Sequence, residues 1–337
     1  MVKNFFIFVT LLLYLRPAQS KNIILIIGDG LGQTGITATR IYKQSIDKNQ
    51  KRLSIDSFHN SAFVQTRSLN NLVTDSAAAA TAIATGEKTN NGMISVLPND
   101  KKLNSIATIA KEKGKSVGII TTTSITHATP AAFYANWHDR GDNKKIAKQL
   151  KSSNFDLFLG GGKKYFKKIP KNFKTVFNKS ELKLITNLKM PLLGLFAHKH
   201  LPYINERNES IPSLSEQSIH AVNLLKKNPK GFFLMIEAGR IDHAAHNNQA
   251  LEQLIETIEL DQTVESILNL IKKDPNLSLD NTSILVTSDH ETGGLSLNGY
   301  FKQDQSILAN TKQGHKILSY STGPEGHFKT KKSAHTG

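Results

Sequence analysis

Short apolar runs rich in β-branched residues recur along the chain, and each ends in polar or glycine-rich residues. They occupy residues 23–27, 62–65, 116–121, 155–159, 231–236 and 283–286. Continuous apolar runs of this length are typical of strands buried on both faces of a sheet. Between them, residues 76–85 are rich in alanine, and residues 103–113, 215–227 and 249–272 have apolar positions spaced near 3.6. These four segments are predicted to be helices.

The alternation of strands and helices predicts an α/β fold in which helices sandwich a mostly parallel central β-sheet. The length of 337 residues and the hydrophobic content of 39% suit a globular protein with a large core. We expect residues 21–337 to form a single domain. The stretches 163–213 and 293–334 are less regular and are expected to be surface insertions.

The first twenty residues have the pattern of a secretory signal peptide. Lys3 precedes an apolar run at 5–15, and a small-residue segment ends at Ser20. Because 11 apolar residues are too few to span a bilayer, we expect cleavage after Ser20 and no membrane span in the mature protein. The expected location is periplasmic or extracellular.

The composition indicates which partners and which types of metal ligand to expect. The net charge is +16, but only seven of the 43 basic residues are arginine and the lysines are spread along the chain. This pattern favours a solvated basic surface over a specific nucleic-acid site. The chain has no cysteine, so a metal site would use His, Asp, Glu and hydroxyl ligands, which suit zinc and magnesium.

Acidic residues follow three of the predicted strands. Asp29 follows 23–27, Glu237 follows 232–236, and Asp289 and His290 follow 284–287. Because ligands bind at the carboxyl ends of parallel strands, we expect these residues to converge on one edge of the sheet. Asp29 is flanked by glycines that match a dinucleotide loop poorly. By itself it could be either a turn residue or a metal ligand.

Ser76 begins the alanine-rich helix. A serine in this position could be a plain helix cap, or a nucleophile beside the positive end of the helix dipole. The chain has no Gly-x-Ser-x-Gly elbow here, so a metal would have to activate the serine.

Residues 237–246 carry the strongest local signal for a metal site. If a helix begins near Asp242, then Asp242 and His246 share one face at i, i+4 and can bind one zinc ion. Glu237 could face a different ion. A turn at Asp289 would add further ligands, and two close metals could serve phosphoryl transfer. The alternative is a polar helix start with solvated histidines.

Seven motifs occur in the order found in alkaline phosphatases, which the chain resembles from Asp29 to His335, nearly the whole mature chain. They are Gly-Asp-Gly-Leu-Gly at 28–32, Thr-Asp-Ser-Ala-Ala at 74–78, Ala-Thr-Gly-Glu-Lys-Thr-Asn-Asn-Gly at 84–92, His-Ala-Thr-Pro-Ala-Ala at 127–132, Ile-Asp-His-Ala-Ala-His at 241–246, Thr-Ser-Asp-His-Glu at 287–291 and His-Thr-Gly at 335–337.

The resemblance implies a phosphomonoester hydrolase that acts through a phosphoserine at Ser76, with Arg140 as the phosphate clamp. It also implies small phosphomonoester substrates and a homodimer. The implied metals are two zinc ions and a third ion of the magnesium type. Their implied ligands are Asp242, His246 and His335 for one zinc, Asp29, Asp289 and His290 for the other, and Asp29, Thr129 and Glu237 for the third site.

Two features depart from the best-studied enterobacterial member of the family. His127 and His243 stand where that enzyme has Asp and Lys, and both positions are next to the metal ligands. The identity of the third ion is therefore open between magnesium, zinc and cobalt. The sequence also stops two residues after His335, where family members continue. Two readings stay open: the sequence is truncated at its C-terminus, or the tail that carries His335 is held only by the metal.

Three alternative functions are considered. A phosphodiesterase of the same superfamily would tend to use Thr and to lack a clamp such as Arg140. A sulfatase would need a processed Cys or Ser in a motif that is absent around Ser76. A truncated protein that binds phosphate or polyanions without turnover is the third.

Overall fold

The computed structural model describes residues 21–49, 52–166, 168, 170–299, 306–310, 314, 316–322 and 335–336, the last two by their backbone alone. The predicted signal peptide, residues 1–20, lies outside the described residues. Within the described residues, no helix has both the length and the apolar character needed to cross a bilayer.

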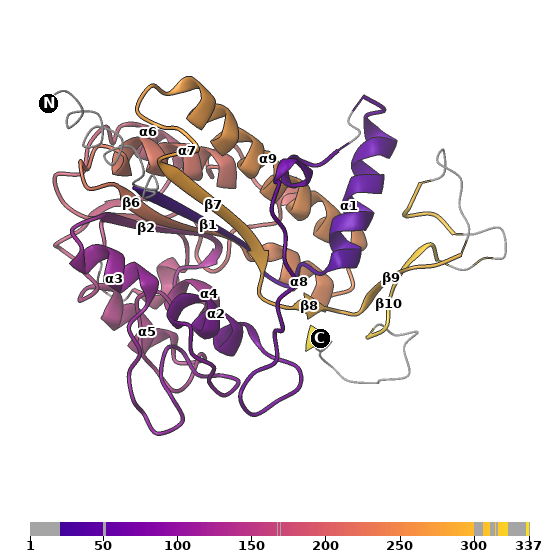
Figure 1. The fold of residues 1–337 in the computed structure, drawn as a ribbon, viewed down its shortest axis with the longest axis horizontal. Helices are drawn as coiled ribbons and strands as arrows, with labels where there is room; N and C mark the ends of the chain where they lie inside the picture. Colours follow the sequence, from indigo (N-terminus) through magenta and orange to yellow (C-terminus); the bar gives the residue numbers. More distant parts are fainter. Residues whose placement is uncertain are drawn as a thin grey trace, which may run out of the picture.

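A seven-stranded parallel sheet forms the centre of the structure (Figure 1). Its strand order is β4-β5-β3-β2-β6-β1-β7, and every pairing within it is parallel. The strands are β1 (Asn22–Gly28), β2 (Ser116–Ser124), β3 (Leu157–Gly161), β4 (Lys174–Val176), β5 (Leu192–Leu195), β6 (Phe232–Ala238) and β7 (Thr282–Ser288). The predicted fold class is therefore confirmed.

Helices cover both faces of the sheet. Those on one face are α2 (Ser76–Thr85), α3 (Ile106–Glu112), α4 (Ala128–Ala131) and α5 (Asn143–Leu150). The other face carries α6 (Lys179–Lys183), α7 (Leu214–Leu225) and α9 (Ala250–Lys273), with α1 (Gln33–Ile46) packed beside α9. The short helix α8 (Arg240–His246) lies between β6 and α9.

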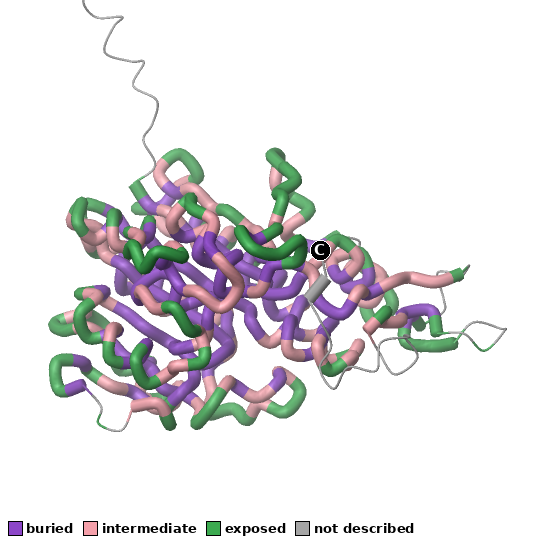
Figure 2. The backbone as a smooth tube through the Cα atoms, turned by 90° about the horizontal axis from the view of Figure 1, so that it is seen from below, coloured by how far each residue is buried: buried purple, intermediate pink, exposed green. Residues whose placement is uncertain are grey.

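The sheet separates two hydrophobic cores, and this explains the continuous apolar runs. In β1, Leu25 and Ile27 pack into the core beneath α2 and α3, whereas Ile24 and Ile26 pack into the core beneath α7 and α9. Because successive residues point to opposite faces, each position must be apolar. Figure 2 shows the buried residues concentrated in the middle of the structure and the exposed ones around it.

Two of the predictions about elements are wrong. Residues 62–65 form no strand, and Phe63 is 94% exposed. The stretch 163–213 is not a set of surface insertions alone, because it contributes β4 and β5 to the central sheet. A segment as short as 62–65, with three apolar residues, carries no information about whether a partner strand exists, and β4 is too short to show a period.

The described part of 293–334 lies outside the central sheet. Strands β9 (Leu295–Leu297) and β10 (Leu318–Tyr320) pair antiparallel and project to one side of the sheet (Figure 1). Their residues Leu295 and Leu318 pack with Ala38 of α1 and Leu254 of α9. The last pairing joins β8 (Glu291–Thr292) to β11 (His335–Thr336).

Candidate active site

The carboxyl ends of β1, β6 and β7 meet at one edge of the sheet because these strands are parallel neighbours. Asp29 directly follows β1, Glu237 is the second-to-last residue of β6, and Asp289 and His290 follow β7. The predicted convergence of these residues is therefore confirmed.

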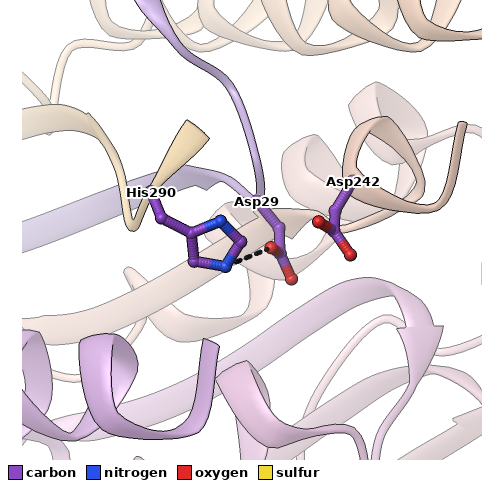
Figure 3. Close-up of side chains that lie close together, drawn as sticks. All are labelled: Asp29, Asp242 and His290. Carbon is purple, nitrogen blue, oxygen red and sulfur yellow. Dashed lines mark ion pairs between the residues drawn. The ribbon is translucent and has the colours of Figure 1, made fainter. Parts of the chain in front are cut away.

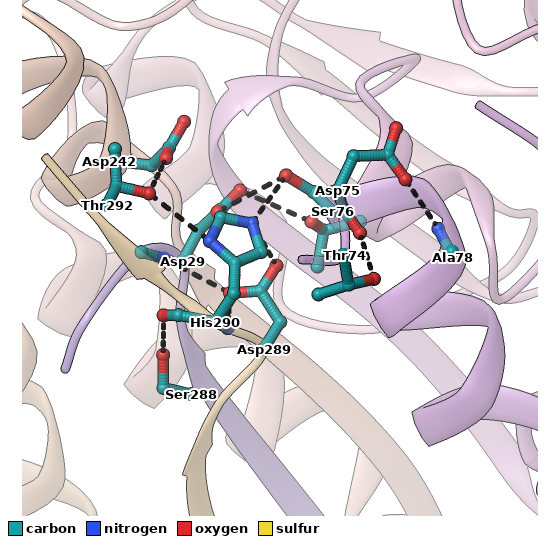
Figure 4. A network of polar contacts seen from close by, with 12 residues as sticks. Asp29, Thr74, Asp75, Ser76, Ala78, Asp242, Ser288, Asp289, His290 and Thr292 are labelled. Atoms are coloured by element: carbon teal, nitrogen blue, oxygen red, sulfur yellow. Dashed lines mark hydrogen bonds and ion pairs between the residues drawn. The ribbon is translucent and has the colours of Figure 1, made fainter. Parts of the chain in front are cut away.

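Ser76 is the first residue of α2 and not its cap. The cap is Asp75, whose Oδ1 accepts a hydrogen bond of 3.0 Å from the Ala78 amide. The fully buried Ser76 hydroxyl instead faces the sheet edge. Its Oγ lies 3.1 Å from His290 Nε2 and 3.4 Å from Asp29 Oδ1 (Figure 4).

A first cluster of possible metal ligands joins Asp29, Asp242 and His290, whose ligand atoms all lie within 4.8 Å of one another (Figure 3). Asp289 adjoins it, with Oδ2 at 3.4 Å from His290 Nε2. As predicted, Asp242 and His246 meet on one face of α8, at 3.3 Å between Oδ1 and Nε2. These contacts bring members of both predicted zinc sites together.

Contacts around His290 fix which of its nitrogens can bind a metal. The Glu291 carbonyl oxygen lies 3.0 Å from Nδ1. A carbonyl can only accept, so Nδ1 carries the proton and Nε2 presents a lone pair to the site. Thr292 Oγ1 donates to Asp242 Oδ1 at 2.6 Å. The backbone of His335 pairs opposite Thr292, but the His335 side chain lies outside what is described.

A second cluster joins Asp29, His127 and Glu237, again with ligand atoms within 4.8 Å of one another. Thr129 Oγ1 donates to Asp29 Oδ2 at 3.3 Å. Glu237 Oε2 accepts from Thr121 Oγ1 and, at 3.1 Å, from Thr123 Oγ1. The residues predicted for the third metal therefore lie together, with His127 beside them.

The site buries negative charge. Asp29, Glu237, Asp242 and Asp289 are each at most 3% exposed. Burial, and then the charges of Asp289, Asp242 and Glu237, hold the pKa of Asp29 well above its usual range. Burial also raises the pKa of Asp289, and it raises the pKa of Glu237 to about 7. Buried carboxylates need compensating positive charge, which divalent cations supply.

These donors suit divalent metals chemically. Zinc binds imidazole nitrogen and carboxylate oxygen, and magnesium binds carboxylate and hydroxyl oxygen. The first cluster offers both kinds of donor, and the second offers mainly oxygen. The residues present therefore fit the implied ions.

Arg140 bonds Asp75, the residue that directly precedes Ser76. Arg140 Nη1 donates to Asp75 Oδ2 at 2.9 Å, and its Nη2 lies 3.3 Å from His127 Nε2. Asp75 Oδ2 also accepts from the Gly92 amide at 3.0 Å. The residue that caps α2 thus holds the guanidinium beside Ser76.

Besides His127, two histidines adjoin the second cluster. The sequence predicted His243 but not His200. The rings of His127 and His243 lie 5.3 Å apart between centroids. His200 lies 4.5 Å from His243 and 5.5 Å from His127 by the same measure. Burial lowers the pKa of His243 to about 3 and that of His200 to about 4, so both rings are neutral at physiological pH.

Sequence reasoning also missed Arg240, Tyr203 and Thr292. Arg240 Nη1 lies 2.7 Å from His243 Nδ1, and its guanidinium lies 3.8 Å above the Tyr203 ring. His200 and Tyr203 follow β5, so the apolar run at 191–196 is the sequence feature that could have predicted a strand before them. Because 163–213 was expected to be a surface insertion, neither residue was predicted to lie at the edge of the sheet.

Comparisons with known proteins identify relatives of this chain. The family model described as alkaline phosphatase matches residues 20–174 and 167–336. Alkaline phosphatase 4 of Bacillus subtilis is 35% identical over 296 residues, covering 83% of this chain and 63% of that protein. The human tissue-nonspecific isozyme is 33% identical over 381 residues, covering 92% of this chain and 71% of that protein. This chain therefore spans less than two thirds of the Bacillus relative.

Among solved structures, alkaline phosphatase from the Antarctic bacterium TAB5 is 29% identical and matches with a TM-score of 0.78. The match covers 94% of this chain and 89% of that one. A variant of the TAB5 enzyme with one histidine replaced by glutamate has magnesium bound in its M3 site. On the family match over nearly its whole length and on these relatives, the chain belongs to the alkaline phosphatase family.

Proposed function

We propose that the protein is a metal-dependent phosphomonoester hydrolase that acts through a phosphoserine at Ser76. The observation that carries this proposal is the position of the Ser76 hydroxyl. It is buried at the start of α2, and its oxygen lies within 3.4 Å of both Asp29 and His290, two members of a candidate metal cluster. A serine that only capped a helix would bond its own backbone instead.

We assign the metal ligands as the family resemblance implies. Asp29, Asp289 and His290 would hold a zinc ion beside Ser76, and a magnesium-type ion would be held by Asp29, Thr129 and Glu237. The second zinc ion would be held by Asp242, His246 and His335. When bound, such ions lower the pKa of a coordinated hydroxyl or water and neutralise charge on phosphoryl oxygens.

The clusters support this assignment, because each contains members of the proposed ligand sets. The magnesium in the TAB5 variant supports an oxygen-rich third site in this family. His127 stands where an imidazole would join that site, so zinc or cobalt could compete with magnesium there.

The chain's own residues then account for the reaction. Ser76 Oγ loses its proton and attacks the phosphorus atom, and the bond from phosphorus to the ester oxygen breaks, so that phosphoserine forms and the ester oxygen takes up a proton and leaves as the alcohol. Water then loses a proton and attacks the phosphorus, the bond to Ser76 Oγ breaks, Ser76 regains its proton, and inorganic phosphate is released. The N-terminal end of α2 favours negative charge on the serine oxygen. Arg140, held by Asp75, grips two phosphoryl oxygens with its planar fork and favours a monoester dianion over a diester.

The test is hydrolysis of p-nitrophenyl phosphate by the purified protein with zinc and magnesium, from neutral to alkaline pH. Bis-p-nitrophenyl phosphate is the diester comparison. Ser76→Ala should abolish turnover, whereas Ser152→Ala, at an exposed serine, should leave it intact. Faster diester turnover would favour the phosphodiesterase. Phosphate binding without any turnover would favour the non-catalytic alternative.

We also propose that the protein is exported and forms a homodimer. The pattern of residues 1–20 supports export, which N-terminal sequencing of the secreted protein tests. Apolar side chains crowd the exposed segment 63–73, where Phe63 is 94% and Leu72 88% exposed, and such patches mark protein interfaces. Light scattering should therefore show a dimer that Phe63→Asp with Leu72→Asp dissociates. A monomeric parent protein would refute the dimer.

A further inference from the structure

Residues 196–213 join β5 to α7 and lie against the candidate active site; we call this segment the strap. It carries His200, whose ring lies 4.5 Å from that of His243 between centroids. It also carries Tyr203, whose ring centroid lies 3.8 Å from the Arg240 guanidinium. The strap therefore contacts residues that adjoin the second cluster, and the contacts that hold it in place decide how closed that side of the site is.

Two buried glutamates of α9 anchor the strap. The Ile204 amide donates to Glu256 Oε1 at 2.7 Å, and the Leu214 amide, where α7 begins, donates to Glu259 Oε1 at 2.9 Å. Arg207, on the strap, bonds Glu259 Oε1 at 2.5 Å and lies 3.8 Å from Glu256 Oε1. The side chains of Arg207, Glu256 and Glu259 are at most 4% exposed. Their charges therefore act on one another with little screening by water.

The charges in this group do not balance. Two carboxyl groups share one guanidinium, and Oε2 of both Glu256 and Glu259 has no hydrogen-bond partner within the described residues. The other groups that act on Glu256 are Arg240 of α8, more weakly than Arg207, and Tyr203, which is neutral because burial raises its pKa. Burial, and then the charge of Glu259, raise the pKa of Glu256 to about 8.

We propose that the strap is a pH-sensitive latch, which lies closed on α9 while Glu256 and Glu259 together hold one proton and lifts from α9 when that proton is lost to solvent. Helix α9 is 24 residues long and packs against α1, α7 and α8, so the strap is the partner that can move. Lifting it lets water reach both carboxylates and removes the cost of burying their charge. His200 and Tyr203 move with the strap, so the latch controls access to the second cluster. It does not require the proposed hydrolase activity.

The direction of the pH response follows from the two states of Glu256. Its carboxyl group has a pKa of 4.5 in water and of about 8 in the closed strap. Between these values opening releases a proton, so the open fraction rises with pH and levels off above about pH 8. The strap should therefore open roughly 30- to 100-fold more at pH 9 than at pH 6.

Amide hydrogen exchange measured by mass spectrometry reports this opening. Zinc and magnesium are kept present, so that the acids of the candidate metal clusters are compensated. After correction for the intrinsic pH dependence of exchange, peptides covering 197–213 should lose protection by that factor, whereas peptides from β6 should not. Glu256→Gln cannot ionise and keeps an acceptor for the Ile204 amide, so its strap should stay protected at pH 9. Glu265→Gln, at an exposed glutamate of α9, should behave as the parent.

Two further measurements test the pair and the opening separately. Glu259→Gln removes the charge that disfavours ionisation of Glu256 and leaves Arg207 to pair with Glu256, so its loss of protection with pH should be smaller than in the parent. Trypsin at pH 9 should cleave after Arg207, which is 4% exposed in the closed strap. That cleavage should be at least about tenfold faster in the parent than in Glu256→Gln, because proteolysis follows the open population.

Three results would overturn the latch. The first is strap protection that does not change with pH in the parent, and the second is an equal loss of protection in Glu256→Gln. The third is a loss that includes β6 to the same extent, because it would report unfolding of the whole domain. An unchanged pH response in Glu259→Gln would also contradict the proposal, since the two glutamates would then not share the proton.

Discussion

Removing divalent metal should make the stability of this protein fall as the pH rises, and Glu237→Gln should suppress part of that fall. Glu237 is fully buried, and burial raises its pKa from 4.5 to about 7. Between these two values the folded protein keeps a proton that the unfolded chain releases. The folded state therefore binds more protons, and stability decreases with rising pH until the loss is complete above about pH 7.

The size of the effect follows from the pKa difference. A shift from 4.5 to about 7 corresponds to roughly 3 kcal/mol of unfolding free energy. Glutamine cannot ionise, and its amide oxygen can still accept from Thr121 and Thr123. In chelator, Glu237→Gln should therefore be more stable than the parent at pH 8 by up to about 3 kcal/mol. At pH 5, where Glu237 is protonated, the two should differ little.

Urea unfolding at pH 5 and pH 8, with chelator or with zinc and magnesium, measures these differences. Added metal should stabilise the parent more at pH 8 than at pH 5, because metals bind the deprotonated ligands, and it should stabilise Glu237→Gln less. Glu265→Gln, at an exposed glutamate of α9, should behave as the parent. The reasoning is refuted if Glu237→Gln in chelator is no more stable than the parent at pH 8.

Three further predictions concern other parts of the structure. Arg140→Ala should raise KM for p-nitrophenyl phosphate by roughly 10- to 100-fold, because a charged two-oxygen contact is lost; an unchanged KM would exclude Arg140 as the clamp. Arg207→Ala should lower the unfolding free energy by about 3–5 kcal/mol, because it leaves the buried Glu259 uncompensated; a loss below about 1 kcal/mol, typical of exposed pairs, would contradict this. Gly30→Ala should cost at least about 2 kcal/mol and lower the zinc content measured by atomic emission, because φ is +69° and the new Cβ would lie 2.9 Å from Asp242 Cα; normal stability with a full zinc content would refute this role of Gly30.

Most of the sheet could be predicted from the sequence because its strands are buried on both faces. Burial on both faces produces apolar runs that stand out without knowledge of their partners, as in β1 and β6. The helix at 76–85 was predicted with its observed bounds, because a run of alanines between a cap and a glycine leaves few alternatives. This reasoning failed for the exposed segment around Phe63, because an apolar run alone does not indicate whether other elements cover it.

The candidate ligands could be predicted for a related reason. Asp29 and Asp289 directly follow strands and Glu237 lies near the end of one, so the topology of a parallel sheet brings them together. His200 and Tyr203 follow β5, whose run was overlooked within an irregular stretch. Arg240 stands within a recognised segment, but its contact with His243 depends on the rotation of a short helix, and the sequence does not reveal that rotation.

The buried acids explain how a basic chain can depend on cations. The net charge is +16, yet the carboxyl edge of the sheet holds four almost fully buried carboxylates. Surface lysines cannot neutralise them, because interactions between charges separated by more than a Debye length are screened. Under the proposed function the basic surface would instead attract anionic esters, while the buried acids would oppose folding until cations bind beside them. The same residues would thus make the folded state require metal and give that metal its position beside Ser76.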